Sequence, residues 1–224
     1  ARPRFAMVGL RRPWYPDRVG RVATRSQMTA NDFLAWERAQ AEKHEFFRGE
    51  VFAMAGGSVR HNALSGRVLR ALATALEPRG CVVLTSDQRV QGADHHYVYP
   101  DVTVVCGLPE LTKHDVLANP TALVEVLSST TEQYDRGLKW EGYQRIAALQ
   151  DYVLVSQAEP RIELFRRGAD GTWIYQAAGA GQQLTLRSGA VLDVDAIFAG
   201  TAALPGGRHP RPRTPRPARS RRCR

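Results

Sequence analysis

Apolar and polar positions alternate with helical and then strand spacing from about residue 28 onward. Thr29 is a candidate N-cap for a helix over residues 29–40, because a threonine there can accept a hydrogen bond from the first free backbone amides. The apolar face of this helix is formed by Phe33, Leu34 and Trp36. Residues 44–57 then predict a β-hairpin that turns at Arg48-Gly49.

A second helix follows directly and has the strongest periodicity in the chain. Gly56 and Gly57 interrupt the hairpin pattern, and Ser58 is placed to cap the helix that follows. Apolar residues then recur at every fourth position, at Leu64, Val68, Leu72 and Leu76. This spacing predicts one buried helical face.

The rest of the chain is dominated by short segments rich in β-branched residues. The predicted strands cover residues 81–90, 97–106, 121–129, 151–157, 161–167 and 172–176, and a third helix covers residues 136–149. Strands interspersed with helices are typical of a single α/β domain in which helices flank a mixed β-sheet. We therefore predict one such domain over residues 28–200.

The net charge of +9 is concentrated at the two ends of the chain. Residues 1–27 contain seven arginines and one aspartate, and residues 208–224 contain eight arginines and no acid, whereas residues 28–207 carry a net charge of −5. We predict that residues 1–27 and the proline- and arginine-rich residues 201–224 are disordered basic extensions. Such a tail either binds polyanions without sequence preference or has no selected role.

Cysteine content and hydropathy bear on the compartment. No run approaches 18 consecutive apolar residues, and the start of the chain lacks the apolar core of a signal peptide, so neither feature predicts membrane association. Cys81, Cys106 and Cys223 are odd in number and lack C-x-x-C spacing. We therefore predict no disulfide framework, a cytoplasmic location, and buried structural roles for Cys81 and Cys106.

Two acidic residues lie inside otherwise apolar strands. Asp101 follows Pro100 in the strand over 97–106, and Glu125 lies between Val124 and Val126. A buried carboxylate is costly unless it is paired, hydrogen-bonded or bound to a metal. Two such groups on neighbouring strands favour a hard divalent ion, Mg²⁺ or Mn²⁺. The alternative, that both side chains point outward from edge strands, is equally compatible with the spacing.

The helix after the Glu125 strand carries a second polar set. Asp135, Lys139 and Tyr143 are spaced i, i+4, i+8 and can lie on one helix face. A lysine beside metal-binding carboxylates can orient a water molecule and stabilise negative charge developing on a phosphate. The alternative is a solvated Asp–Lys pair of small energetic effect.

About three-quarters of the chain, from Met28 to Phe198, resembles the Uma-type restriction endonuclease family, a branch of the PD-(D/E)XK nuclease superfamily. The matching stretches, in family order, read MTANDFLAWERAQAEKHEFFRGEVFAMAGGSVRHN, YVYPDVTVVC, LVEVLSSTTEQYDRGLKWEGYQRI and DYVLVSQAEPRIELFRR. The resemblance implies a restriction-endonuclease-like fold, Mg²⁺- or Mn²⁺-dependent hydrolysis of DNA and a homodimer. In it Asp101 matches the Asp of the Pro-Asp motif, and Glu125 matches the acidic residue of the following strand.

The resemblance also implies roles for residues outside the two strands. The superfamily lysine normally lies two residues after the Glu, where this chain has Leu127, and Lys139 on the next helix is its counterpart, accompanied by Asp135 and Tyr143. Glu45 and His61 match recurrent family positions. Glu45 is a candidate additional carboxylate near the metal, and His61 either binds phosphate or metal or caps its helix.

Some local features depart from the family pattern or suggest other sites. The family sequence Leu-Ser-Pro-Ser-Thr is replaced by residues 127–131, LSSTT, in which Ser128, Thr130 and Thr131 are predicted to cap the helix. His95 and His96 follow Asp94 in a polar turn. We predict that they are exposed loop residues rather than metal ligands.

These observations lead to one function and one rival. We expect a metal-dependent endonuclease in which Asp101, Glu125 and Lys139 act on DNA, supported by Asp135, Tyr143, Glu45 and His61. The rival is a catalytically silent nucleic-acid-binding or protein-interaction module on the same fold.

Overall fold

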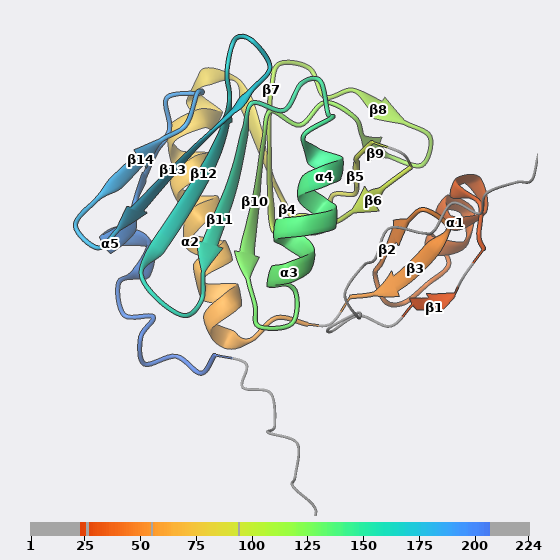
Figure 1. Ribbon diagram of the computed structural model, residues 1–224, viewed down its shortest axis with the longest axis horizontal. Helices are drawn as coiled ribbons and strands as arrows, with labels where there is room; N and C mark the ends of the chain where they lie inside the picture. Colours follow the sequence, from red (N-terminus) through yellow and green to blue (C-terminus); the bar gives the residue numbers. More distant parts are fainter. Residues whose placement is uncertain (1–22, 26, 55, 94, 207–224) are drawn as a thin grey trace, which may run out of the picture.

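The computed structural model describes residues 23–25, 27–54, 56–93 and 95–206. Its strands form a six-stranded sheet, a seven-stranded sheet and a two-stranded hairpin, with helices packed against them (Figure 1). The predicted class, a mixed β-sheet flanked by helices, is confirmed, but the strands are divided over more than one sheet.

The six-stranded sheet is the centre of the molecule. In spatial order it contains β13 (Trp173–Gly179), β12 (Arg161–Arg167), β11 (Asp151–Ser156), β10 (Ala122–Leu127), β7 (Val102–Cys106) and β4 (Cys81–Thr85). β10 and β11 are parallel, and the other neighbours are antiparallel. The parallel pair requires a crossover, which the helical segment between these two strands provides.

One face of this sheet is covered by the second predicted helix. α2 (Val59–Leu76) is capped by the Ser58 hydroxyl, which accepts a hydrogen bond from the backbone amide of His61, and it ends in a 3₁₀ turn, η1 (Glu77–Arg79). The four periodic residues of α2 are buried, as predicted. Three further elements complete this layer: β14 (Gln183–Thr185), β15 (Val191–Asp193) and α5 (Val194–Phe198). All three lie beyond the last predicted strand and were not predicted, because elements of three to five residues give too short a pattern to detect.

The opposite face is covered by a helical segment that begins earlier than predicted. It consists of α3 (Glu132–Tyr134), the π-helical segment η2 (Asp135–Lys139) and α4 (Trp140–Tyr143). Residues 144–149, the end of the helix predicted over 136–149, form turns instead. Turns of π-helix are rare and often mark functional sites.

The seven-stranded sheet lies beside this segment (Figure 1). Its spatial order is β1 (Ala23–Arg25), β3 (Glu50–Ala53), β2 (His44–Phe47), β6 (Tyr97–Val98), β5 (Val90–Gln91), β9 (Val116–Leu117) and β8 (Leu111–Thr112). The predicted hairpin is β2–β3. Helix α1 (Ala30–Glu37) begins after Thr29, whose hydroxyl accepts a hydrogen bond from the amide of Asp32, as predicted.

Two predicted strands are each split between the two large sheets. The segment 81–90 forms β4 in one sheet and β5 in the other, and the segment 97–106 forms β6 and β7 in the same way. The second break includes Pro100, which cannot donate a hydrogen bond to a sheet ladder. Asp101 therefore lies at the point where the chain passes from one sheet into the other.

The prediction of no disulfide is wrong. Cys81 on β4 and Cys106 on β7 are directly opposed in the antiparallel register and form a disulfide. Spacing along the sequence could not reveal this pair, because it depends on strand register. Disulfides persist mainly in oxidising compartments, so cysteine usage no longer supports the cytoplasmic location, which stays a prediction.

The two predicted extensions fall mostly outside the described residues, at 1–22 and 207–224. Of the remainder, Ala23–Arg25 form β1, and Thr201 is buried. The carbonyl of Pro205 accepts a hydrogen bond from the amide of Arg60 in the first turn of α2. Within the described part of the chain, no helix is long and apolar enough to span a membrane.

Candidate active site

Strand register brings the two predicted acidic residues together. β7 and β10 are antiparallel and pair Val102 with Val124, so one further step along each strand places Asp101 opposite Glu125. Glu125 points to the face covered by η2 and α4, where it contacts Lys139 and Tyr143, and Asp101 lies in the bend just before β7. The Asp101 carboxylate accepts a hydrogen bond of 2.7 Å from the amide of Val126. Neither residue points outward from an edge strand.

Lys139 extends from the π-helical segment onto these carboxylates. Its Nζ lies 2.8 Å from Glu125 Oε1, 3.2 Å from Glu45 Oε1 and 3.3 Å from Asp135 Oδ1. The Tyr143 hydroxyl donates to the same Glu125 oxygen at 2.9 Å. All five side chains are buried, so the solvated Asp–Lys pair is excluded.

His61 approaches from the first turn of α2. Its Nε2 lies 3.2 Å from Asp101 Oδ2. Burial lowers the pKa of His61, but the hydrogen bond and negative charge of Asp101, together with Asn62 and Asp135, outweigh burial and leave that pKa raised. Gly57 permits this placement, because a Cβ there would lie 2.6 Å from His61 Nδ1. The ring thus faces a carboxylate, and it is the backbone amide of His61 that takes part in capping, with Ser58.

These groups line a cavity of about 730 Å³. Its walls come from residues 41–43 and 56–58, the start of α2, Asp101 just before β7, the end of β10, the loop over residues 128–131 and η2. Of the predicted site residues, Asp101, Glu125, Asp135, Lys139 and His61 line this cavity. Glu45 and Tyr143 are fully buried and do not line the cavity. Glu45 pairs with Lys139, and Tyr143 donates a hydrogen bond to Glu125.

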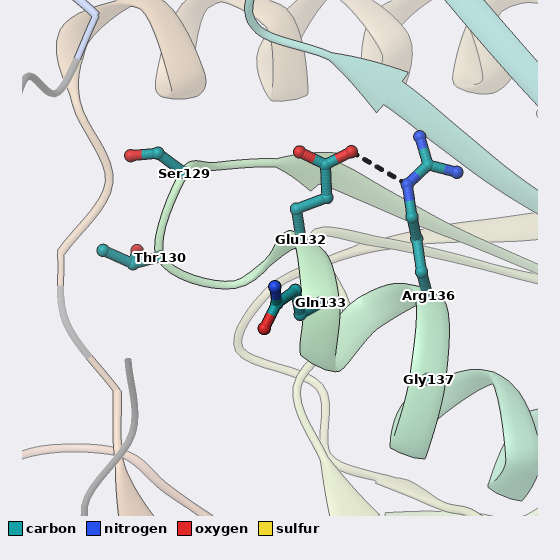
Figure 2. A pocket seen from close by; sticks show the side chains of 6 residues that line it. All are labelled: Ser129, Thr130, Glu132, Gln133, Arg136 and Gly137. Atoms are coloured by element: carbon teal, nitrogen blue, oxygen red, sulfur yellow. Dashed lines mark hydrogen bonds and ion pairs between the residues drawn. The ribbon is translucent and has the colours of Figure 1, made fainter. Parts of the chain in front are cut away.

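A smaller hollow of about 510 Å³ lies against the same loop and shares Ser129 and Thr130 with the main cavity (Figure 2). Its cation, Arg136, donates to Glu132 at 2.9 Å and to both oxygens of Glu163, so its charge is already neutralised. The hollow therefore offers little attraction to a phosphate.

The loop hydroxyls bond mainly to one another. Ser128 Oγ accepts a hydrogen bond from the Thr131 amide at 3.2 Å. The hydroxyls of Thr130 and Thr131 each lie 2.9 Å from Ser128 Oγ. Thr131 is the N-cap residue of α3, but its side chain makes no capping hydrogen bond, so the predicted side-chain cap is not formed there.

The buried cluster holds more negative than positive charge. Burial raises the pKa of Glu125 well above its usual range, although the Lys139 charge acts in the opposite direction. Burial likewise raises the pKa of Asp135, again opposed by Lys139. One lysine thus pairs with three carboxylates, and a further cation would stabilise their ionised forms.

The donor set fits a hard divalent ion. Within the described residues, no three His, Cys, Asp or Glu side chains form a ready-made metal site. Asp101 Oδ1 and Glu125 Oε2 accept no hydrogen bond from any described residue, and the buried Asp135 Oδ1 also lacks one. Mg²⁺ in proteins is usually held by one or two carboxylates while keeping several waters. Asp101 and Glu125 meet that requirement.

The raised pKa values predict a pH-dependent stability. A carboxyl whose pKa is raised by folding contributes stability that is fully present below its unfolded value, here 4.5 for Glu125 and 3.8 for Asp135, and lost as the pH rises through the folded value. Relative to wild type, Glu125→Gln should therefore gain unfolding free energy as the pH rises from about 4 to 7. Urea unfolding at several pH values measures this difference. Exposed Glu159→Gln is the matched control, and parallel curves for wild type and Glu125→Gln would contradict the prediction.

Two residues at the site were not predicted. His96 is fully buried, which corrects its prediction as an exposed loop residue, whereas His95 is exposed. The ring of Tyr134 lies under the Lys139 ammonium, 5.5 Å from Nζ to the ring centre. An available signal was Gly142 inside the predicted helix, since a glycine there indicates close approach of another group.

Comparison with known proteins places this chain in a family. A family model described as "Putative restriction endonuclease", Uma2, matches residues 30–200. Two uncharacterized proteins of Synechocystis sp. are similar: slr1290 is 36% identical over 178 residues, covering 79% of this chain and 94% of that protein, and sll1609 is 35% identical over 156 residues, covering 68% and 88%.

A solved structure shows the same fold. The crystal structure of a "putative nuclease belonging to DUF820" from Anabaena variabilis aligns with a TM-score of 0.63 at 15% identity, over 76% of this chain and 97% of that one. The resemblance seen in the sequence motifs and the nuclease-like fold are thereby confirmed. The chain belongs to the Uma2 family of restriction-endonuclease-like proteins.

Proposed function

We propose that the protein is a metal-dependent endonuclease that hydrolyses phosphodiester bonds in DNA. The observation that carries this proposal is the placement of Lys139 Nζ 2.8 Å from Glu125, with Asp101, just before the neighbouring strand β7, at the same cavity. Family membership supports a nuclease, and the geometry supports these residues as its site.

Asp101 and Glu125 are the residues that would hold Mg²⁺ or Mn²⁺. When bound, such an ion lowers the pKa of a water molecule and polarises the phosphate. Asp101 is oriented for this role by the Val126 amide, and Glu125 by Lys139 and Tyr143. These hydrogen bonds fix one oxygen of each carboxylate and leave the other for the ion.

The remaining groups act on the substrate phosphate and the attacking water. Lys139 faces three carboxylates, and its ammonium orients the water and stabilises negative charge on the phosphate. His61, whose pKa is raised beside Asp101, places a second partly positive group at the cavity. Asp135 and Glu45 hold the lysine in place.

DNA and a second copy of the chain are the proposed partners. Cutting both strands of a duplex is easiest with two sites, which a homodimer would provide. Sedimentation of the full chain with and without duplex DNA tests the dimer: a monomer under both conditions would contradict it.

The function is tested by incubating the full chain with supercoiled plasmid DNA and either Mg²⁺, Mn²⁺ or EDTA. We expect nicked and linear products with the metals and none with EDTA, and Glu125→Gln should give no products under any condition. DNA binding without cleavage by the wild type would support the catalytically silent binding module instead. Parallel reactions with single-stranded DNA and RNA define the substrate class.

A further inference from the structure

His96 occupies a buried position between Tyr134 and Tyr143, the two aromatic residues that contact Lys139 and Glu125. Its Nε2 lies 3.0 Å from the Tyr134 hydroxyl, and its ring is nearly parallel to that of Tyr143, with centres 6.4 Å apart and planes at 15°. Phe47 contacts the same ring edge-on at 4.9 Å. A polar ring that is fully buried and held on three sides is fixed in one orientation.

The turn that carries His96 docks onto helix α4. The amide of Gly92 donates to the His96 carbonyl at 2.6 Å, and the amide of Ala93 donates to the Gly142 carbonyl at 3.5 Å. A Cβ at Gly142 would lie 2.6 Å from His96 Nδ1, closer than side chains tolerate. The imidazole therefore packs against the helix backbone at a position that only glycine allows.

The two tyrosines beside His96, Tyr134 and Tyr143, contact the proposed catalytic groups. The Tyr134 ring lies 5.5 Å below Lys139 Nζ, a distance at which a cation is attracted to the face of an aromatic ring. The Tyr143 hydroxyl donates a hydrogen bond to Glu125 Oε1, and the Lys139 ammonium donates to the same oxygen. One imidazole thus supports both ends of the Lys139–Glu125 pair.

We propose that His96 is a positioning residue that sets the location of Lys139 through Tyr134 and that of Glu125 through Tyr143. It touches neither substrate nor metal and acts through these two tyrosines. This inference rests on the proposed nuclease function and adds to it a group outside the cavity lining.

The hydrogen bond between His96 and Tyr134 is tested by a double-mutant cycle. His96→Phe keeps an aromatic ring and removes the bond, and Tyr134→Phe removes the same bond while keeping the ring under Lys139. Each variant should lower kcat roughly 10- to 100-fold with KM unchanged, since small displacements of catalytic groups have effects of this size. The double variant should fall no further than either single one, and His96→Gln, which can still bond to the Tyr134 hydroxyl, should recover part of the loss.

Two glycines of the same helical segment provide a matched comparison. Gly142→Ala pushes on the His96 ring without removing any polar group, whereas a Cβ at Gly137 meets nothing within 4 Å. We expect Gly142→Ala to lower kcat as His96→Phe does, and Gly137→Ala to leave it unchanged. Thermal unfolding of all variants shows whether they are folded.

A readout independent of cleavage separates this inference from the function. In crystal structures of His96→Phe and Gly142→Ala, Lys139 Nζ should lie displaced from Glu125 Oε1 relative to wild type. A wild type that does not cut DNA would overturn the proposed function, and the position of Lys139 would then decide the inference alone. Losses that multiply in the double variant, or an unmoved Lys139, would overturn the role of His96.

Discussion

Asp101→Asn should abolish metal-dependent cleavage while the protein stays folded. Electrostatic stabilisation by a bound metal is worth several kcal/mol, so we expect kcat to fall by at least about 10³-fold. The fold should survive because the asparagine carbonyl oxygen can still accept the hydrogen bond that Val126 donates to Asp101 at 2.7 Å. Plasmid cleavage and calorimetric titration of Mn²⁺ into wild type and variant measure the two effects.

The matched control is Asp115→Asn, since the Asp115 side chain is 77% exposed and pairs with Arg38 at the surface. It should bind metal and cut DNA as wild type does. A structural check comes from His61: loss of the neighbouring negative charge should lower the pKa of that imidazole, which NMR titration follows. Undiminished cleavage by Asp101→Asn would remove Asp101 from the site.

Residues that violate a local pattern were the predictable part of this site. Asp101 and Glu125 stand in apolar stretches of the sequence where a charge is costly, and strand register brings them together at one cavity. Lys139 could be placed on the right helix face by its spacing from Asp135 and Tyr143. A charged residue in an otherwise apolar pattern often belongs to a functional site, and such an exception can be recognised from the sequence alone.

Contacts set by tertiary packing were not predictable. His96 lies in a polar stretch that has the composition of an exposed turn, and its burial arises only because Gly142, 46 positions later, admits the ring. The Cys81–Cys106 disulfide likewise depends on the register of β4 against β7. Similarly, the break at Pro100 separates two sheets, which a continuous apolar pattern over residues 97–106 conceals.

Lys139→Met should be strongly destabilising at neutral pH. The lysine side chain is 4% exposed, and its ammonium is within 3.3 Å of oxygens of three buried carboxylates, Glu45, Glu125 and Asp135. Removing one partner of a buried ion pair leaves an uncompensated charge and typically lowers the unfolding free energy by about 3–5 kcal/mol. Methionine keeps the length and apolar stem of the side chain, so the effect isolates the charge. Urea unfolding at pH 7 measures it.

The loss should shrink as the pH falls. Burial already raises the pKa values of Glu125 and Asp135, and without Lys139 to oppose burial both should rise further. Since stability tied to a raised pKa is lost as the pH rises through the folded value, the variant should approach wild-type stability toward about pH 4. A destabilisation that is constant with pH would show that packing, not charge, causes it.

A second substitution separates charge from packing. Glu125→Gln removes one of the three negative charges around Lys139, so the double variant Lys139→Met/Glu125→Gln should be more stable at pH 7 than Lys139→Met alone. The surface control is Lys113→Met: Lys113 is exposed and lies outside the cavity lining, so its replacement should cost less than about 1 kcal/mol. If the double variant is no more stable than Lys139→Met, Lys139 does not act as the counter-charge of Glu125, and its assignment as the lysine of this site fails with it.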